Sequence, residues 1–194
     1  MNMIRMLLKP FQECKNIVSS IIIFWPCTQF GNSLRIWFYK RKLKSLGKNA
    51  NIESGVLFGQ PEKIVIGEEC IFGRNVNVNA GECNGIFIGN NIALAEGTYI
   101  RSGNHRFDNL DIPILRQGHR SKVISYANST YSVVIEDNVW VGAHSIILSG
   151  AWIGSGSVIG AGARVSGVIP QNSIVVGNPG VIVGNRKEKY GSKI

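Results

Sequence analysis

Aliphatic residues recur at every sixth position through the last third of the chain. From Ile135 the sequence reads in sixes as IEDNVW, VGAHSI, ILSGAW, IGSGSV, IGAGAR and VSGVIP. The first positions are Ile135, Val141, Ile147, Ile153, Ile159 and Val165. The fifth positions hold small or aliphatic residues, namely Val139, Ser145, Ala151, Ser157, Ala163 and Ile169. A period of six fits neither a helix nor an alternating strand, whereas hexapeptide repeats build a β-helix.

Each hexad of such a β-helix forms one short strand and one turn, and three hexads close a triangular coil. The first-position side chain fills the interior, and the fifth residue must be small enough to lie beside it. Stacked coils bury a continuous column that no single coil could bury alone. The sequence therefore predicts an all-β fold, a parallel β-helix.

The pattern recurs upstream with interruptions. The first positions of two earlier coils are Ile66, Phe72 and Val78, then Ile88, Leu94 and Ile100. Four extra residues around 81–85 separate these coils, and we expect them to bulge from a corner. A rougher first coil starts at Ile52 and slips by two residues before Ile66. The β-helix is thus predicted over residues 49–185, with about five coils.

Hexads are missing between Ile100 and Val133. A segment of that length inside a compact domain is usually functional or disordered, so we expect one long loop at about 101–132. It begins with Gly103-Asn104-His105, which makes His105 a candidate functional side chain.

Residues 1–48 differ in kind from the repeats. The apolar run Ile17–Trp25 is followed by Pro26 and is too short for a bilayer span of about 20 residues. Residues 34–46 fit a helix with an aromatic and aliphatic face, which Gly47 would end. The opposite, basic face of this helix contains Arg35, Lys40, Lys42 and Lys44.

Basic residues concentrate in the same segment. Residues 1–50 contain nine Lys and Arg against Glu13 alone, so they carry +8 of the net charge of +9. The rest of the chain is nearly neutral, which argues against a nucleic-acid partner. A shorter basic tail is expected at 186–194. The N-terminal segment suits contact with the inner membrane or a lipid-linked glycan, or else packing on a neighbouring subunit.

The cysteines show no metal-binding or redox spacing. Cys14, Cys27, Cys70 and Cys83 form no C-x-x-C pair and have no histidine at zinc-ligand spacing. We expect buried free thiols and no metal site. The N-terminus has a charged first third and no small-residue cleavage site, so the sequence predicts no secretory signal and a cytoplasmic protein.

The stretch from Asp137 to Gly180 resembles the signature of the hexapeptide-repeat acetyltransferases, particularly the galactoside, maltose and polysaccharide O-acetyltransferase branch. The similar features are Asp-Asn-Val-Trp-x-Gly at 137–142, Gly-Ala-Gly at 160–162, and Pro-x-Asn-Ser…Gly-Asn-Pro at 170–179. The resemblance covers roughly residues 50–185. It implies a left-handed β-helix, a homotrimer with active sites between subunits, acetyl-CoA as acyl donor, a saccharide acceptor and no metal. Residues 34–52 look like the leader of members that modify capsule, O-antigen or exopolysaccharide sugars.

His105 lies where that branch has its catalytic histidine, just after a repeat and at the mouth of a long loop. A thioester is already activated, so the enzyme has to hold the donor, align a hydroxyl and remove its proton, a task that suits histidine. No Cys-His or Gly-x-Ser-x-Gly arrangement indicates a covalent route. We therefore expect direct transfer with His105 as general base. His119, also in the loop, is a candidate at the acceptor site, while His144 fits either an outward corner or the donor cleft.

The remaining candidate binding residues are chosen on three grounds: alternation with core residues along a strand, a small side chain, or the family resemblance. Asn77 and Asn79 alternate with core valines and so point outward, where the family has an acceptor-contacting Asn. For the donor, the candidates are Trp140, Gly142, Gly160, Ala161, Arg164, Pro179 and Arg186. The small residues would let the backbone approach the pantetheine amides, and Arg164 or Arg186 would meet the CoA phosphates. Trp140 fits packing between subunits equally well.

Four other functions remain open at this point. A γ-type carbonic anhydrase on the same fold needs three converging histidines, and this chain has three at mismatched spacings. A β-helical scaffold or binding protein with a decayed donor site is a non-enzymatic alternative. Within acyl transfer, the alternatives are N-acetylation of an amino sugar and acetylation of a xenobiotic.

Overall fold

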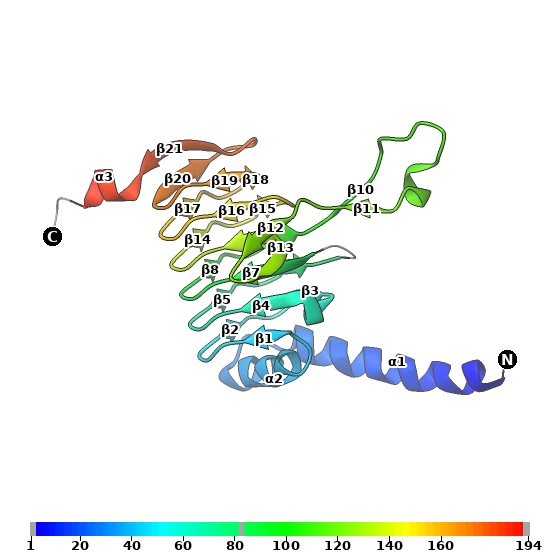
Figure 1. Ribbon diagram of the computed structural model, residues 1–194. Helices are drawn as coiled ribbons and strands as arrows, with labels where there is room; N and C mark the ends of the chain where they lie inside the picture. Colours follow the sequence, from blue (N-terminus) through cyan, green and yellow to red (C-terminus); the bar gives the residue numbers. More distant parts are fainter. Residues whose placement is uncertain (1–2, 82–83, 192–194) are drawn as a thin grey trace.

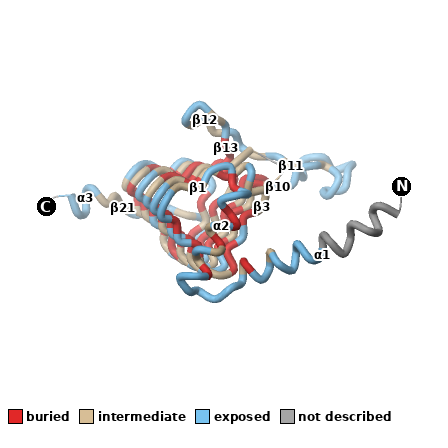
Figure 2. Tube along the Cα trace, turned by 90° about the horizontal axis from the view of Figure 1, so that it is seen from below, coloured by how far each residue is buried: buried red, intermediate tan, exposed pale blue. Residues whose placement is uncertain are grey.

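The computed structural model describes residues 3–81 and 84–191, with side chains from residue 13 onward. Two helices, α1 (Met3–Phe24) and α2 (Gln29–Lys40), precede a triangular prism of stacked coils, and a long loop leaves the prism midway along its axis (Figure 1). Viewed along that axis, the buried residues lie within the prism, whereas α1 and the loop extend away from it (Figure 2). The predicted all-β β-helix with an N-terminal helical appendage is confirmed.

Three parallel sheets form the prism faces. Sheet A contains β1 (Ser45–Leu46), β4 (Ile64–Ile66), β7 (Gly85–Ile88), β13 (Ser129–Ile135), β16 (Trp152–Ile153) and β19 (Val168–Ile169). Sheet B contains β2 (Asn51–Ile52), β5 (Ile71–Phe72), β8 (Ala93–Leu94), β14 (Trp140–Val141), β17 (Val158–Ile159) and β20 (Ser173–Val176). Sheet C contains β3 (Leu57–Gly59), β6 (Asn77–Asn79), β9 (Tyr99–Arg101), β15 (Ile146–Ile147) and β18 (Arg164–Val165). The described strands thus make five complete coils and two sides of a sixth.

The hexad rule accounts for the core. First-position residues stack in register from coil to coil, as in the column Ile66, Ile88, Ile135 and Ile153. The fifth position predicted for Ile169 is wrong: it pairs with Ile153 and continues this column, because the last repeat is two residues short. A fifth-position residue lies beside each first-position residue. Cys70 occupies one such position, and burial raises the pKa of its thiol to about 11. Burial was wrongly predicted for Cys14 and Cys27, which are exposed because they lie outside the repeats, and Cys83 is outside the described residues.

The chain departs from the hexad spacing twice between sheets C and A. The bulge expected around 81–85 includes residues 82–83, which lie outside the described residues; β6 ends at Asn79 in sheet C, and β7 starts at Gly85 in sheet A. The two-residue slip before Ile66 is a turn of 3-10 helix, η1 (Pro61–Lys63), at the same kind of corner.

The helix predicted to end at Gly47 ends at Lys40. Residues 45–46 already form β1, so the first coil starts earlier than expected. Gly47 is a corner residue, and a Cβ there would lie 2.4 Å from the carbonyl of Gly67 in the next coil. The glycine is therefore required for coil stacking and does not terminate a helix.

Helix α2 closes the base of the prism by hydrogen bonding to the first coil. The Arg35 Nε donates to the carbonyl of Ile52 (2.7 Å), and the Asn32 Oδ1 accepts from the Ile52 N–H (2.8 Å). The Tyr39 hydroxyl donates to the carbonyl of Val56 (2.7 Å). Arg35 was predicted on a solvent-facing basic surface, but its side chain is fully buried. These hydrogen bonds satisfy backbone N–H and carbonyl groups at the open edge of the first coil, which has no further coil beneath it.

The loop predicted at 101–132 contains a two-stranded antiparallel ribbon. Strand β10 (Asn104–His105) pairs with β11 (His119–Arg120), and η2 (Ile114–Arg116) lies between them. The chain then returns through β12 (Ile124–Tyr126), which pairs with β13.

The described C-terminal residues also form regular structure. Strand β21 (Val181–Asn185) folds back antiparallel on β20, and α3 (Arg186–Tyr190) follows it. None of the described helices has the length and apolar character needed to cross a bilayer.

Candidate active site

His105 lies at the C/A corner, the edge at which the chain leaves sheet C for sheet A. Directly before it, Ser102 and Gly103 are buried, and the Ser102 hydroxyl donates to the carbonyl of Ala80 in the coil below. The Arg101 Nε donates to the carbonyl of Gly103 (2.9 Å). These contacts fix the start of the ribbon, so an exposed His105 side chain is held on an anchored backbone.

The ribbon brings His105 and His119 together, although 13 residues separate them in the sequence. They face each other in the β10–β11 register, and their ring centroids are 4.4 Å apart. The prediction that both belong to one site is consistent with this geometry. Beyond them, Arg106 forms an ion pair with Asp108 (3.0 Å), which lowers the pKa of that exposed carboxyl.

A polar pocket of about 340 Å³ lies at the same corner, but neither histidine lines it. It is lined by Asn104, Arg120, Ser121, Lys122 and Ser149. The Lys122 N–H donates to the Ser149 hydroxyl (2.9 Å), which ties the returning loop to the prism. Sequence reasoning missed this lining, because its residues come from both ends of the loop and from a later corner. Only the proximity of Arg120 to His119 in the sequence was available as a signal.

Asn77 and Asn79 lie on the outer face of sheet C, as predicted from alternation. Asn79 pairs with Arg101 in the next strand and so lies at the same corner as His105, whereas Asn77 pairs with Tyr99 farther along the face. The Asn79 Oδ1 already accepts from the Gly81 N–H (2.8 Å), which stabilises the turn. Asn77 is half-buried and starts β6, on the B/C side of the same face.

The predicted donor residues gather at a different edge, the B/C corner between sheets B and C. Gly142 lies there directly below Gly160 and Ala161 of the next coil. A Cβ at Gly142 would lie 2.5 Å from the Ala161 nitrogen, so coil stacking alone requires this glycine. Ala161 is exposed at the surface of the corner. His144 lies at the same corner, exposed and with a positive φ of 56°, and hence apart from the other two histidines.

Arg164 and Pro179 extend this B/C corner towards the top of the prism. The Arg164 Nε donates to the Asn178 Oδ1 (2.8 Å), and the following Asn178–Pro179 peptide is cis. Both residues border a pocket of about 490 Å³ that is otherwise mainly apolar and is lined by residues 165–169 and 180–182. A guanidinium beside an apolar hollow can bind an anionic ligand that has a hydrophobic part.

Two predicted donor residues lie elsewhere. Trp140 is 55% exposed on the outer face of sheet B, between Ala93 and Val158 of the neighbouring coils. Arg186 lies across sheet B at the A/B corner, where its guanidinium donates to the carbonyl of Gly156. Within one chain, Arg164 is therefore the predicted basic residue that joins the donor corner, and Arg186 is separated from it by the width of the sheet.

The described residues contain no group of three side chains placed to hold a metal ion. The candidate residues instead form two clusters on opposite edges of sheet C. The C/A corner carries the two loop histidines, Arg101 and the polar pocket. The B/C corner carries the glycine and alanine turn, Arg164 and the Asn178–Pro179 turn.

Comparison with known proteins supports an acyl-transfer fold. Residues 132–167 match the bacterial transferase hexapeptide (six repeats) family. A probable acetyltransferase of Mycobacterium tuberculosis is 30% identical over 135 residues, which cover 70% of this chain and 39% of the relative. A galactoside O-acetyltransferase of Lactococcus lactis is 35% identical over 125 residues, covering 59% of this chain and 59% of the relative. This chain thus spans less than two thirds of the length of either relative.

Among solved structures, a galactoside acetyltransferase in complex with coenzyme A has a TM-score of 0.69 with this chain at 22% identity, over 93% of this chain and 83% of that one. At this identity the likeness establishes the fold alone, a left-handed β-helix of stacked coils. The repeats matched at 132–167 are those of the hexapeptide-repeat transferase family, and in this chain they form the upper coils of the β-helix.

Proposed function

We propose that this protein is an acetyl-CoA-dependent O-acetyltransferase that modifies a sugar hydroxyl of a cell-surface polysaccharide or its precursor. Its two matched relatives are named acetyltransferases, and one of them acts on galactosides by its name. The pocket at the same corner as His105 is polar and has two cationic side chains, Arg120 and Lys122, which suits a hydroxyl-rich acceptor that bears an anionic group. The proposed location is the cytoplasm, where acetyl-CoA is available.

The observation that carries this proposal is the placement of the two clusters on opposite edges of one sheet. His105 thus lies across the width of sheet C from the donor candidates Gly142, Ala161 and Arg164, and His144 is the histidine at their corner. A cyclic homotrimer joins unlike surfaces of neighbouring subunits, so one subunit's C/A corner can meet the next subunit's B/C corner. We therefore propose a trimer with three composite sites.

The chemistry needs little more than alignment and one proton transfer. A neutral His105 imidazole takes the proton of the acceptor hydroxyl as the oxygen attacks the thioester carbonyl carbon. The tetrahedral intermediate collapses with cleavage of the carbon–sulfur bond, and protonated His105 returns the proton to the leaving thiolate. The His119 ring, tilted by 38° with its centroid 4.4 Å away, limits the orientations open to His105.

The direct test is His105→Ala. Positioned general-base catalysis contributes roughly 10²–10⁴ in rate, so we expect a loss of acetyl transfer in that range. Because His105 is exposed and lies outside the aliphatic core, the melting temperature, the oligomeric mass and coenzyme A binding should be unchanged. Turnover should be measured with hydroxyl sugars, with amino sugars and with polysaccharide fragments.

Three results would contradict parts of the proposal. An active His105→Ala enzyme would exclude His105 as the general base. If His144→Ala then lost acetyl-transfer activity, the general base would be His144 at the B/C corner. A preference for amino sugars would replace O-acetylation by N-acetylation. Absence of coenzyme A binding would favour a non-enzymatic β-helix.

A further inference from the structure

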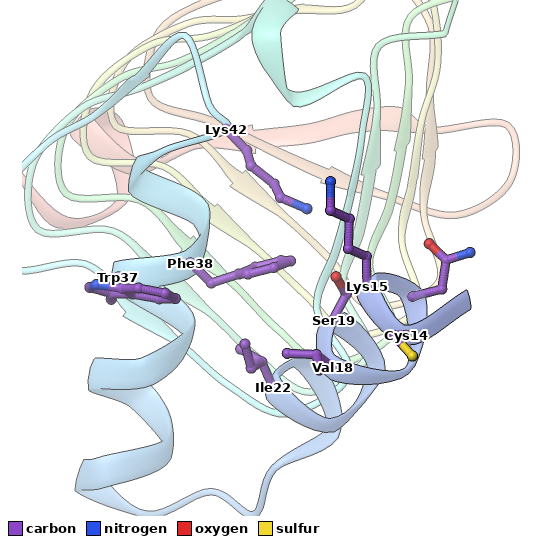
Figure 3. A pocket seen from close by; sticks show the side chains of 9 residues that line it. Cys14, Lys15, Val18, Ser19, Ile22, Trp37, Phe38 and Lys42 are labelled. Atoms are coloured by element: carbon purple, nitrogen blue, oxygen red, sulfur yellow. The ribbon is translucent and has the colours of Figure 1, made fainter. Parts of the chain in front are cut away.

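The two N-terminal helices enclose a groove that the proposed reaction does not use. It has a volume of about 510 Å³ and is lined by Cys14, Lys15, Asn16, Val18, Ser19, Ile22, Trp37, Phe38 and Lys42. Val18 and Ile22 of α1 face Phe38 of α2 across its floor (Figure 3). Ile22 and Phe38 are buried on the prism side, and Val18 and Trp37 are exposed. The groove is thus an apolar channel that is open to solvent.

The apolar surface continues beyond the groove onto the outer side of α1. Ile17, Val18, Ile21 and Phe24 follow one another at helical spacing and are each more than half exposed, with Ile17 at 59%. A helix that packs only on its own prism would carry polar residues on this side. A contiguous exposed apolar patch of this kind marks an interaction surface.

Cations border this surface. Lys40, Arg41, Lys42 and Lys44 follow the end of α2 and are all exposed. The Arg41 guanidinium lies 4.2 Å from the Trp37 ring centroid, and the Lys42 ammonium lies 3.9 Å from that of Phe38. Aromatic rings with cations over their faces suit a boundary between hydrocarbon and water, where the ring is apolar and the cation remains hydrated.

We propose that the surface formed by α1, α2 and residues 40–44 docks the protein on a lipid bilayer with anionic headgroups. The apolar side of α1 would enter the headgroup and acyl boundary, while the bordering cations meet the phosphates. The charge pattern favours this partner over a second copy of the chain, because residues 1–50 carry a net +8 and two copies would repel each other. Lysine is also depleted at the core of protein interfaces. The proposal does not depend on the acetyl-transfer reaction.

The test is flotation of the full-length protein with vesicles of phosphatidylcholine alone or mixed with phosphatidylglycerol. Wild-type protein should float with the anionic vesicles only, and less so at high salt because the ionic attraction is screened. Lys40→Gln with Lys44→Gln should weaken partitioning about 30-fold, since each basic residue near an anionic surface contributes about fivefold. Ile17→Ser with Ile21→Ser should weaken it about tenfold or more.

Matched controls come from the opposite end of the prism. Lys187→Gln with Lys189→Gln removes the same number of exposed charges, and Ile182→Ser with Val183→Ser removes exposed aliphatic residues. Both control proteins should bind vesicles like the wild type. Equal losses in test and control pairs would overturn the proposal, as would binding that ignores lipid charge. A fall in oligomeric mass of the Ile17→Ser, Ile21→Ser protein without lipid would assign the surface to a second copy instead.

Discussion

At the scale of single residues, burial cannot be inferred from chemical type when the partner is distant in sequence. Arg35 is spaced like the lysines of a solvent-facing helix side, yet it is fully buried and donates to the carbonyls of Ile52 (2.7 Å) and Trp25 (2.6 Å). The Ile52 carbonyl comes within reach of Arg35 only once the first coil has formed beside α2. The burial of the aliphatic first-position residues was predictable, because the same hexad places each of them in the interior of a coil.

Replacing Arg35 with alanine should therefore be costly. The change leaves two carbonyl groups without their donor and opens a space at the helix and coil junction, which we expect to lower the free energy of unfolding by about 3 kcal/mol. Chemical denaturation monitored by circular dichroism measures the loss. Lys40→Ala, an exposed change on the same helix, should alter stability by no more than about 0.5 kcal/mol. Equal effects of the two changes would contradict a structural role for Arg35.

At the scale of elements, the strands of the prism were predictable and the ribbon was not. The first residue of each hexad fills the interior of a coil. The position of each strand can therefore be predicted by counting six residues from the previous one. The β10–β11 ribbon has no such period, and its register depends on residues 104–105 meeting residues 119–120. Sequence reasoning therefore located His105 and His119 in one loop but could not show that their rings lie in contact.

The part of the loop beyond the ribbon should contact another subunit. Leu110 is 97% exposed and Leu115 is 84% exposed, and isolated chains rarely leave several large apolar side chains uncovered on one projection. Leu110→Ser with Leu115→Ser should weaken trimer assembly about tenfold or more. Sedimentation equilibrium over a range of concentrations measures this effect. An unchanged association constant with both serines present would exclude the loop from the interface.

At the scale of the whole molecule, the two site clusters occupy separate corners, and counting hexads could not show this. The sequence supplied both sets of residues, but Arg164 and Arg186 were equivalent candidates until the fold placed them at the B/C and A/B corners. The distribution of sites follows from the strand order of the coils and from the return of β21 over β20.

Complementation between inactive subunits should reveal the composite site. His105→Ala removes the base, and Ala161→Trp fills the exposed donor corner, so each protein alone should be inactive. In equal mixtures of refolded subunits, both intact halves meet at about one interface in four, which should restore about a quarter of wild-type turnover. An assay of the mixed trimers measures this recovery. Failure of every mixture to regain activity, with trimers confirmed by mass, would show that each subunit works alone.

The closure of the base by α2 also limits the size of the assembly along the prism axis. A stack of identical coils does not end by itself. The upper edge of each coil exposes a row of backbone donors and acceptors that can pair with the lower edge of another coil. Asn32, Arg35 and Tyr39 occupy this row at the first coil, and β21 covers β20 at the far end. Copies of the chain are therefore prevented from adding end to end. Without these terminators, a fold that repeats so regularly would grow as a filament.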